Sequence, residues 1–192
     1  MNLQVFMALS LLNDLKAAAV DAIEERHKGP ALLLLYSFID ICASLANADP
    51  RAKLGDRFRE YVQKYSLCKW TEFTPHDLWA ARSSLLHAYS PFGDHTKRAD
   101  GARPIFYYAW PEKRHEVEEI LSSRKHTNFL VVDVDTILSI ATSAYNGLII
   151  ATEQDPAVEH TVASNAVNLL RMSEDVRLEQ AMETLRSVGK AT

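Results

Sequence analysis

The sequence predicts a mainly helical fold with a small β-α-β, two-strand insertion, and three observations support this class. Apolar residues recur at helical spacing over most of the chain, first in a stripe formed by Leu9, Leu12 and Leu15. The period changes near 105–110, where β-branched and aromatic residues follow one another, as is typical of a strand. The length of 192 residues and the hydrophobic content of 47% suit one folded unit. We therefore expect a single domain over 1–192, with core helices in 1–90, the insertion in 105–134 and further helices in 135–190.

Two long helices are expected first. Residues 3–28 carry an apolar stripe that continues through Ala19 and Ile23, and Gly29-Pro30 is expected to end this helix. Residues 31–47 are apolar nearly all round, which is typical of a helix at the centre of a bundle. Asp49-Pro50 is expected to close this second helix.

A third helix is expected over 51–65, at the start of a basic segment. Lysine or arginine stands at positions 51, 53, 57, 59, 64 and 69, against two acids, so the local charge over 51–70 is +4. This segment is either a solvated helix face or a phosphate-contacting patch with Tyr61, Tyr65 and Trp70 between the cations.

The remaining elements follow from caps and changes of period. Thr74-Pro75 with Asp77 predicts the start of a helix that runs to about Tyr89, followed by a polar loop over 90–104. Strands are expected over 105–110 and 129–134, with a helix over 112–125 between them. Asp135 is interpreted as the N-cap of a helix to about 151. A last helical region is expected from 155 to 188, with a break near Ser173.

Charge and composition exclude several functional classes. The net charge of -4 and the pI of about 6.0 do not indicate a strongly basic nucleic-acid binder. The six glycines form no phosphate-cradling loop, and no Cys/His cluster has metal-ligand spacing, so we expect no cofactor and no metal. The N-terminus lacks a signal-peptide pattern, and the longest unbroken apolar run, 31–36, is short. We therefore expect a cytoplasmic protein with no membrane partner.

The expected fourth helix contains the strongest candidate for chemistry. Arg82 and His87 form an Arg-x4-His pattern, and Ser83 directly follows the arginine. At about 100° per residue, Arg82 and His87 lie roughly 140° apart on the helix, whereas Tyr89 returns to within about 20° of Arg82. The Arg82 and His87 side chains can converge if the helix end loosens or if a second copy of the helix contributes. The alternative is that both residues only cap the helix or extend their polar ends to solvent.

The residues around this motif resemble the HEPN (higher eukaryotes and prokaryotes nucleotide-binding) superfamily. The resemblance rests on Tyr36-Ser-Phe-Ile-Asp-Ile41, Thr74-Pro-His-Asp-Leu-Trp79, the Arg82-to-His87 run and the Ser90-Pro91 stop. The Ala81–Pro91 run and Phe106-Tyr-Tyr-Ala-Trp110 look like an uncharacterised bacterial, often plasmid-associated branch. The resemblance covers roughly 30–90 well and 100–155 loosely.

The resemblance implies a HEPN-like up-and-down helical bundle that pairs as a homodimer. Many relatives are metal-independent endoribonucleases of toxin–antitoxin or phage-defence systems, and others bind without cleaving. By position, Arg82 and His87 correspond to the family's catalytic pair. Ser83 stands in the polar slot where asparagine, aspartate or histidine is common. RNA and an antitoxin protein are the partners implied.

The chemistry of such a site is consistent with these residue types. A histidine near neutral pKa can accept the proton of the RNA 2'-hydroxyl, and a guanidinium can hold the extra charge of the transition state. The products would be a 2',3'-cyclic phosphate and a free 5'-hydroxyl. Asp40, a carboxylate on the most apolar helix, needs a partner. It is either a buried, hydrogen-bonded structural residue or a group that orients His87 or Arg82.

Three functions remain open from the sequence: a HEPN-type endoribonuclease, a HEPN-like protein that binds RNA or nucleotides without cleavage, and a helical interaction protein. The acidic pI slightly favours the last two. An ion pair between Arg82 and either Asp40 or Asp77 within one protomer would count strongly against the ribonuclease.

Overall fold

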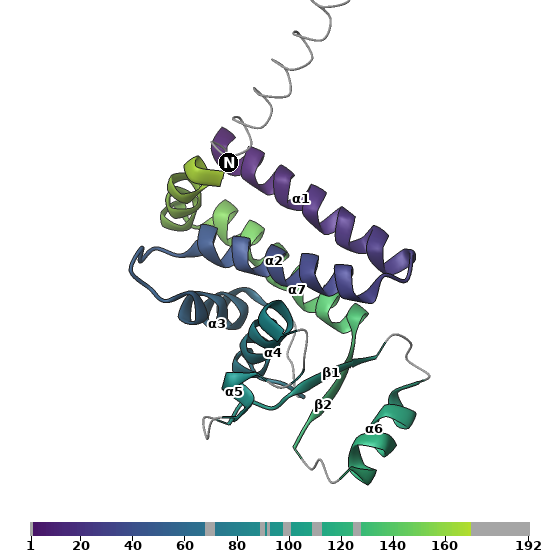
Figure 1. Cartoon of the computed structure of the whole chain (residues 1–192). Coiled ribbons are helices and arrows are strands. Elements are labelled where there is room, and N and C mark those ends of the chain that lie inside the picture. The colour runs from purple at the N-terminus through teal and green to yellow at the C-terminus, as the bar shows by residue number, and fades with distance from the viewer. Residues whose placement is uncertain are drawn as a thin grey trace, which may run out of the picture.

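The computed structural model describes residues 2–67, 72–88, 91, 93–97, 101–108, 113–124 and 128–169. It confirms a mainly helical fold with a small two-stranded parallel sheet (Figure 1). The elements are α1 (Leu3–Glu24), α2 (Lys28–Ala46), α3 (Leu54–Tyr65), α4 (Pro75–Ala88), α5 (Asp94–Lys97), β1 (Ile105–Tyr108), α6 (Arg114–Ser123), β2 (Leu130–Asp133) and α7 (Val134–Gln154), followed by a helical segment over 156–169.

Helix α2 is the centre of the bundle, as its apolar composition predicts. It packs against α1, α3, α4 and α7, and Figure 1 shows α1 and α3 on either side of it. Leu35, Phe38, Ile39 and Cys42 of α2 are completely buried. Burial of large apolar side chains contributes roughly 1.5–3 kcal/mol each, so this helix supplies a major part of the stability of the core.

The turn between α1 and α2 differs from the sequence prediction. Helix α1 ends at Glu24, and Arg26, not Gly29, adopts the left-handed conformation that ends it (φ 61°). The His27 N–H donates to the Ala22 carbonyl and the Arg26 N–H donates to the Ile23 carbonyl, which is a Schellman motif. Gly29-Pro30 instead lies in the first turn of α2. Backbone N–H groups there have no partner within the helix, so the proline costs the helix no hydrogen bond.

The start of α4 is held by a capping box, which confirms the prediction at Thr74 and Asp77. The Thr74 N–H donates to Asp77 Oδ2 (2.8 Å), and the Asp77 N–H donates back to Thr74 Oγ1 (3.1 Å). Asp77 also accepts the backbone N–H of Arg103 (2.8 Å) and its guanidinium (2.7 Å). One buried carboxylate therefore fixes the helix start and joins it to the chain that leads into β1.

The insertion is a β-α-β unit with both faces of its sheet covered. β1 and β2 pair in parallel with Ile105 opposite Leu130, and α6 forms the crossover. Leu121 of α6 packs with Val131 on one face, whereas Val132 joins the main core on the other. Burial on both faces is usual for parallel strands.

The N-cap of α7 differs from the residue that the sequence predicts. The Asp133 carboxylate, two residues before the predicted Asp135, accepts the Thr136 N–H (2.5 Å) and caps α7. The strand continues into the helix with no intervening loop, so the last strand residue also serves as the cap. Because β2 and α7 share Asp133, the sequence contains no separate signal for the start of the helix.

The helical segment 156–169 returns to the end of α2. The Asn165 amide donates to three carbonyls there, of Ser44 (3.2 Å), Leu45 (3.0 Å) and Asn47 (2.8 Å). These carbonyls have no partner within the helix, so a side chain from a distant segment caps α2. The break expected near Ser173 lies outside the described residues.

Three helices are long and apolar enough to cross a membrane by length and composition: α1, α2 and α7. In each of these helices, polar residues interrupt the apolar runs, so no single unbroken run is long. Half of the most apolar stretch of α2, and half of that of α7, is buried inside the bundle. These two helices therefore already use much of their apolar surface within the protein.

Candidate functional site

Arg82 forms an ion pair with Asp40 within the chain. Its Nε (2.8 Å) and Nη2 (2.5 Å) both donate to Oδ2 of Asp40, which joins α4 to the central helix α2. The side chains are only 12% and 14% exposed. The guanidinium also lies over the ring of Trp79, 5.1 Å from its centroid. Arg82 is therefore held on two sides by groups of its own protomer.

Burial of Asp40 sets the electrostatics of this pair. Desolvation raises the pKa of Asp40, while the hydrogen bond and charge of Arg82 and the charge of Arg57 oppose the rise. The second carboxylate oxygen, Oδ1, is buried and has no hydrogen-bond partner. The carboxylate therefore needs Arg82, since loss of the guanidinium would leave a buried charge with little compensation.

The other residues of the motif are placed only in part. Ser83 is partly buried on α4, and His87 lies in its last turn. The His87 side chain and the whole of Tyr89 fall outside the described parts of the chain. Asp77, the other carboxylate considered as a partner for Arg82, pairs with Arg103 instead. The structure therefore joins Arg82 to Asp40.

The basic segment on α3 exposes cations, as the sequence suggests, but its tyrosines are buried. Tyr61 and Tyr65 are 3% and 5% exposed, so they pack inward and cannot stack on nucleotide bases; that part of the patch interpretation is wrong. Arg51, Lys53 and Lys64 are exposed. Trp70 lies outside the described residues. Among the residues of the patch that the structure describes, the exposed ones are cationic and neither tyrosine ring is accessible.

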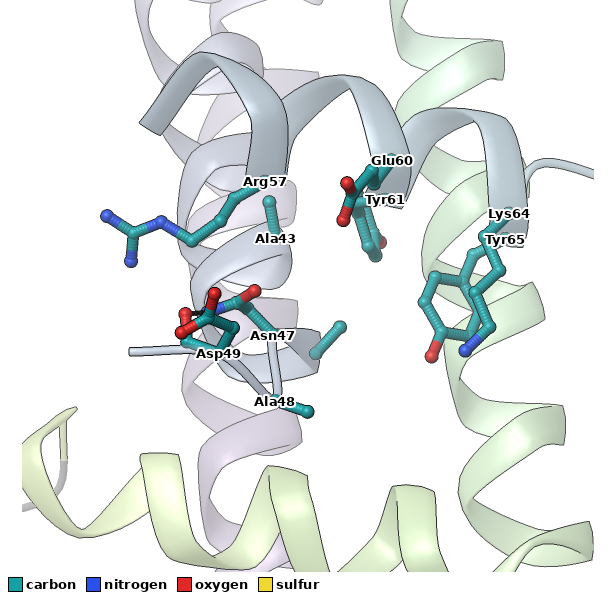
Figure 2. Close-up of a pocket in the computed structure, with 10 residues that line it drawn as sticks. Ala43, Asn47, Ala48, Asp49, Arg57, Glu60, Tyr61, Lys64 and Tyr65 are labelled. Atoms are coloured by element: carbon teal, nitrogen blue, oxygen red, sulfur yellow. Dashed lines mark hydrogen bonds between the residues drawn. The ribbon is translucent and has the colours of Figure 1, made fainter. Parts of the chain in front are cut away.

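A pocket between α2 and α3 was missed by the sequence analysis. Figure 2 shows Arg57 and Asp49 at one end, Lys64 and Tyr65 at the other, and Tyr61 between them. Its volume is about 260 Å³. We call it the α2–α3 pocket, and it is lined by Ala43, Ala46, Asn47, Ala48, Asp49, Arg57, Glu60, Tyr61, Lys64 and Tyr65. The spacing of 57, 61, 64 and 65 along one helix face was the signal that could have revealed it.

Among the residues that the structure describes, no three His, Cys, Asp or Glu side chains lie close enough to hold a metal ion. No family model, curated protein or solved structure matches this chain.

Proposed function

We propose that the protein is a HEPN-like helical module that binds RNA without cleaving it. The observation that carries this proposal is the ion pair between Arg82 and Asp40. A guanidinium held by a carboxylate and an indole of its own protomer has a structural role, and its charge is already largely compensated. This is the arrangement that counts against a catalytic arginine.

The exposed cations at the start of α3 support phosphate binding. Arg51 and Lys53 are exposed, and neither forms an ion pair with any other described residue. Cations of this kind contact the phosphate backbone without reading the sequence, and their binding weakens as salt displaces it. We therefore expect weak, salt-sensitive binding with little sequence preference.

A metal-independent endoribonuclease is the second candidate. The observation that favours it is the geometry at Arg82, because Asp40 engages Nε and Nη2 and leaves Nη1 outside the pair. In that scheme Nη1 would contact the phosphorane, Asp40 would position the guanidinium, and His87 would accept the 2'-hydroxyl proton. Such an enzyme would act as a toxin or phage-defence effector and would have an antitoxin protein as a partner.

One experiment separates the two functions. Labelled mixed-sequence RNA is incubated with the full chain in EDTA, with binding followed by fluorescence anisotropy and the RNA ends analysed afterwards. The first proposal expects binding that weakens with salt and RNA that stays intact. The double variant Arg51→Gln/Lys53→Gln should bind less and lower the salt slope by about 1–2 units, whereas Lys113→Gln, at the N-cap of α6, should behave as wild type.

The outcomes that contradict the proposal are distinct. A folded protein that shows no salt-dependent RNA binding overturns RNA binding as the function. Cleavage that leaves 2',3'-cyclic phosphates, is lost in His87→Ala and is kept in His160→Ala establishes the ribonuclease in its place. His160 is the matched control because it is an exposed histidine outside the motif.

We further propose that the chain forms a homodimer, as the resemblance implies. Light scattering after size-exclusion chromatography should then give about twice the 21.6 kDa of one chain. A monomer across the micromolar range would contradict the dimer and would also remove the two-copy site that the ribonuclease requires.

A further inference from the structure

Lys28 is a half-buried cation with no acidic partner in the described part of the chain. It is the first residue of α2, and its ammonium donates one hydrogen bond to the backbone carbonyl of Tyr107 in β1 (2.8 Å). It forms no ion pair with any described residue. An ammonium carries three N–H donors, so two of them remain for water or for a ligand.

The burial of this cation is not compensated by a neighbouring charge. Desolvation lowers the pKa of Lys28, and no carboxylate among the described residues opposes the change. A charge that leaves water without a partner destabilises the folded protein. An anion placed beside Lys28 would offset this cost, whereas a neutral group or a second cation would not.

Lys28 lines a second pocket, between the start of α2, the last turns of α4 and β1, which we call the Lys28 pocket. Its volume is about 250 Å³. Among the described residues that line it, Lys28 alone is charged. The wall is otherwise mostly apolar and includes the side chains of Leu32, Leu85, Pro91, Ile105 and Phe106.

The other polar side chain at the Lys28 pocket is already bonded. The Tyr107 hydroxyl forms a hydrogen bond with the Tyr36 hydroxyl (2.5 Å), and the Tyr107 carbonyl accepts from Lys28. Among the side chains described at this pocket, the remaining N–H donors of Lys28 are therefore the polar groups that a ligand can use. One cation beside apolar walls is complementary to one negative charge on an apolar body.

We infer that the Lys28 pocket binds a small monocarboxylate with a short apolar tail, of the alkanoate type. The carboxylate accepts from the Lys28 ammonium, and the tail packs against the apolar wall. A phosphate dianion would meet one cation only, and a neutral ligand would leave the ammonium uncompensated. The volume lies below the roughly 300–1,000 Å³ usual for drug-sized ligands, which favours a small molecule. This inference does not depend on RNA binding, which we assign to Arg51 and Lys53.

The test is isothermal titration calorimetry of the full chain with butanoate, hexanoate, hexanamide and inorganic phosphate, up to millimolar concentrations. We expect saturable binding of hexanoate at one site. Hexanamide, which has the same tail without the charge, should bind at least tenfold less tightly. Each CH₂ added between butanoate and hexanoate should tighten binding about fourfold, because the tail is buried. Absence of hexanoate binding, equal binding of hexanoate and hexanamide, or tighter binding of phosphate than of hexanoate overturns the inference.

Variants then assign the binding to this pocket. Lys28→Met keeps a long apolar side chain and removes the charge, so it should bind hexanoate and hexanamide with equal affinity. Lys28→Arg keeps the charge and should retain the preference for hexanoate. Lys53→Met, which removes an exposed cation outside the pocket, should leave both affinities unchanged. A preference for hexanoate that persists in folded Lys28→Met, or that is lost in Lys53→Met, overturns the assignment.

Discussion

The carbonyl oxygen of Tyr65 lies where a side chain on Gly147 would have to be: a Cβ built on that glycine would stand 1.9 Å from the oxygen. Tyr65 is the last residue of α3 and Gly147 is in the middle of α7. The end of α3 therefore touches the backbone of α7, and this contact is possible only because Gly147 has no side chain.

Gly147→Ala is expected to destabilise the protein. Alanine favours a helix by about 1 kcal/mol over glycine, but the clash with backbone forces the helices apart at a cost of roughly 1–3 kcal/mol or more. Urea unfolding of the two proteins measures the difference. Gly55→Ala is the comparison variant, because its Cβ would meet the Trp79 ring at 2.9 Å, a milder clash than the 1.9 Å contact with backbone at Gly147. An equal or smaller loss at Gly147 would contradict the close contact.

The Asp40–Arg82 pair should show strong coupling in a double-mutant cycle. Asp40→Leu or Arg82→Leu alone leaves one buried charge and should lower the free energy of unfolding by about 3–5 kcal/mol. The double variant should be more stable than either single one, because no charge remains. Additive losses measured by urea unfolding would show that the two side chains do not interact.

Asp77 should contribute to stability in a pH-dependent way. Burial alone would raise the pKa of Asp77, but hydrogen bonds from Arg103 and Thr74 hold it below its usual value. Its contribution is therefore present above the unfolded value near pH 3.9 and is lost as pH falls through the lower, folded value. Asp77→Asn should be less stable by about 1–3 kcal/mol at pH 7, and the difference should shrink in acid.

The matched comparison for Asp77 is Asp40, whose pKa is raised in the folded protein. The carboxyl of Asp40 stabilises the fold fully below its unfolded pKa, and this contribution is lost as pH rises through the raised, folded value. Relative to wild type, Asp77→Asn and Asp40→Asn should therefore change the pH dependence of the free energy of unfolding in opposite directions. The free energy of unfolding is measured between pH 3 and pH 7. If it depends on pH in the same way in both variants, the opposite pKa directions of Asp77 and Asp40 are contradicted.

Asn165→Ala should destabilise the protein by about 1–2 kcal/mol, because three carbonyls at the end of α2 lose their donor. Thermal unfolding measures the loss. Asn168→Ala, an exposed asparagine on the same helical segment, should change stability little. Equal melting temperatures for the two variants would show that the cap contributes nothing.

The protein should remain in the supernatant when cells are broken and their membranes are sedimented. Half of the apolar stretch of α2 and of α7 is already buried in the bundle, so insertion of either of these helices into lipid would require the core to be opened. Immunoblotting of the two fractions decides the matter. Retention in the membrane pellet after a carbonate wash would contradict the proposed cytoplasmic location.

Local patterns predicted the fold class well, and long-range contacts explain most of the misses. The capping box at Thr74 and Asp77 involves residues three positions apart, so the sequence reveals it directly. The end of α1 was predicted at the wrong residue because Arg26, a residue type that rarely adopts positive φ, takes the position that glycine usually fills.

The candidate site shows the same limit. Asp40 could be identified from the sequence as a carboxylate in need of a partner, and Arg82 as a residue of interest, because each stands out locally. That they pair depends on how α2 and α4 cross, which no spacing within the chain reveals. The spacing along α3 indicates only one wall of the α2–α3 pocket, because another wall is the loop that follows α2.

Asp133 belongs at once to the end of β2 and to the cap of α7, and this has a mechanical consequence. With no loop between strand and helix, the position of the β-α-β unit is tied through the backbone to that of α7, which packs against α2 and α3. An insertion or deletion at this junction would turn the sheet relative to the core, so the length of the junction fixes where the unit sits on the bundle.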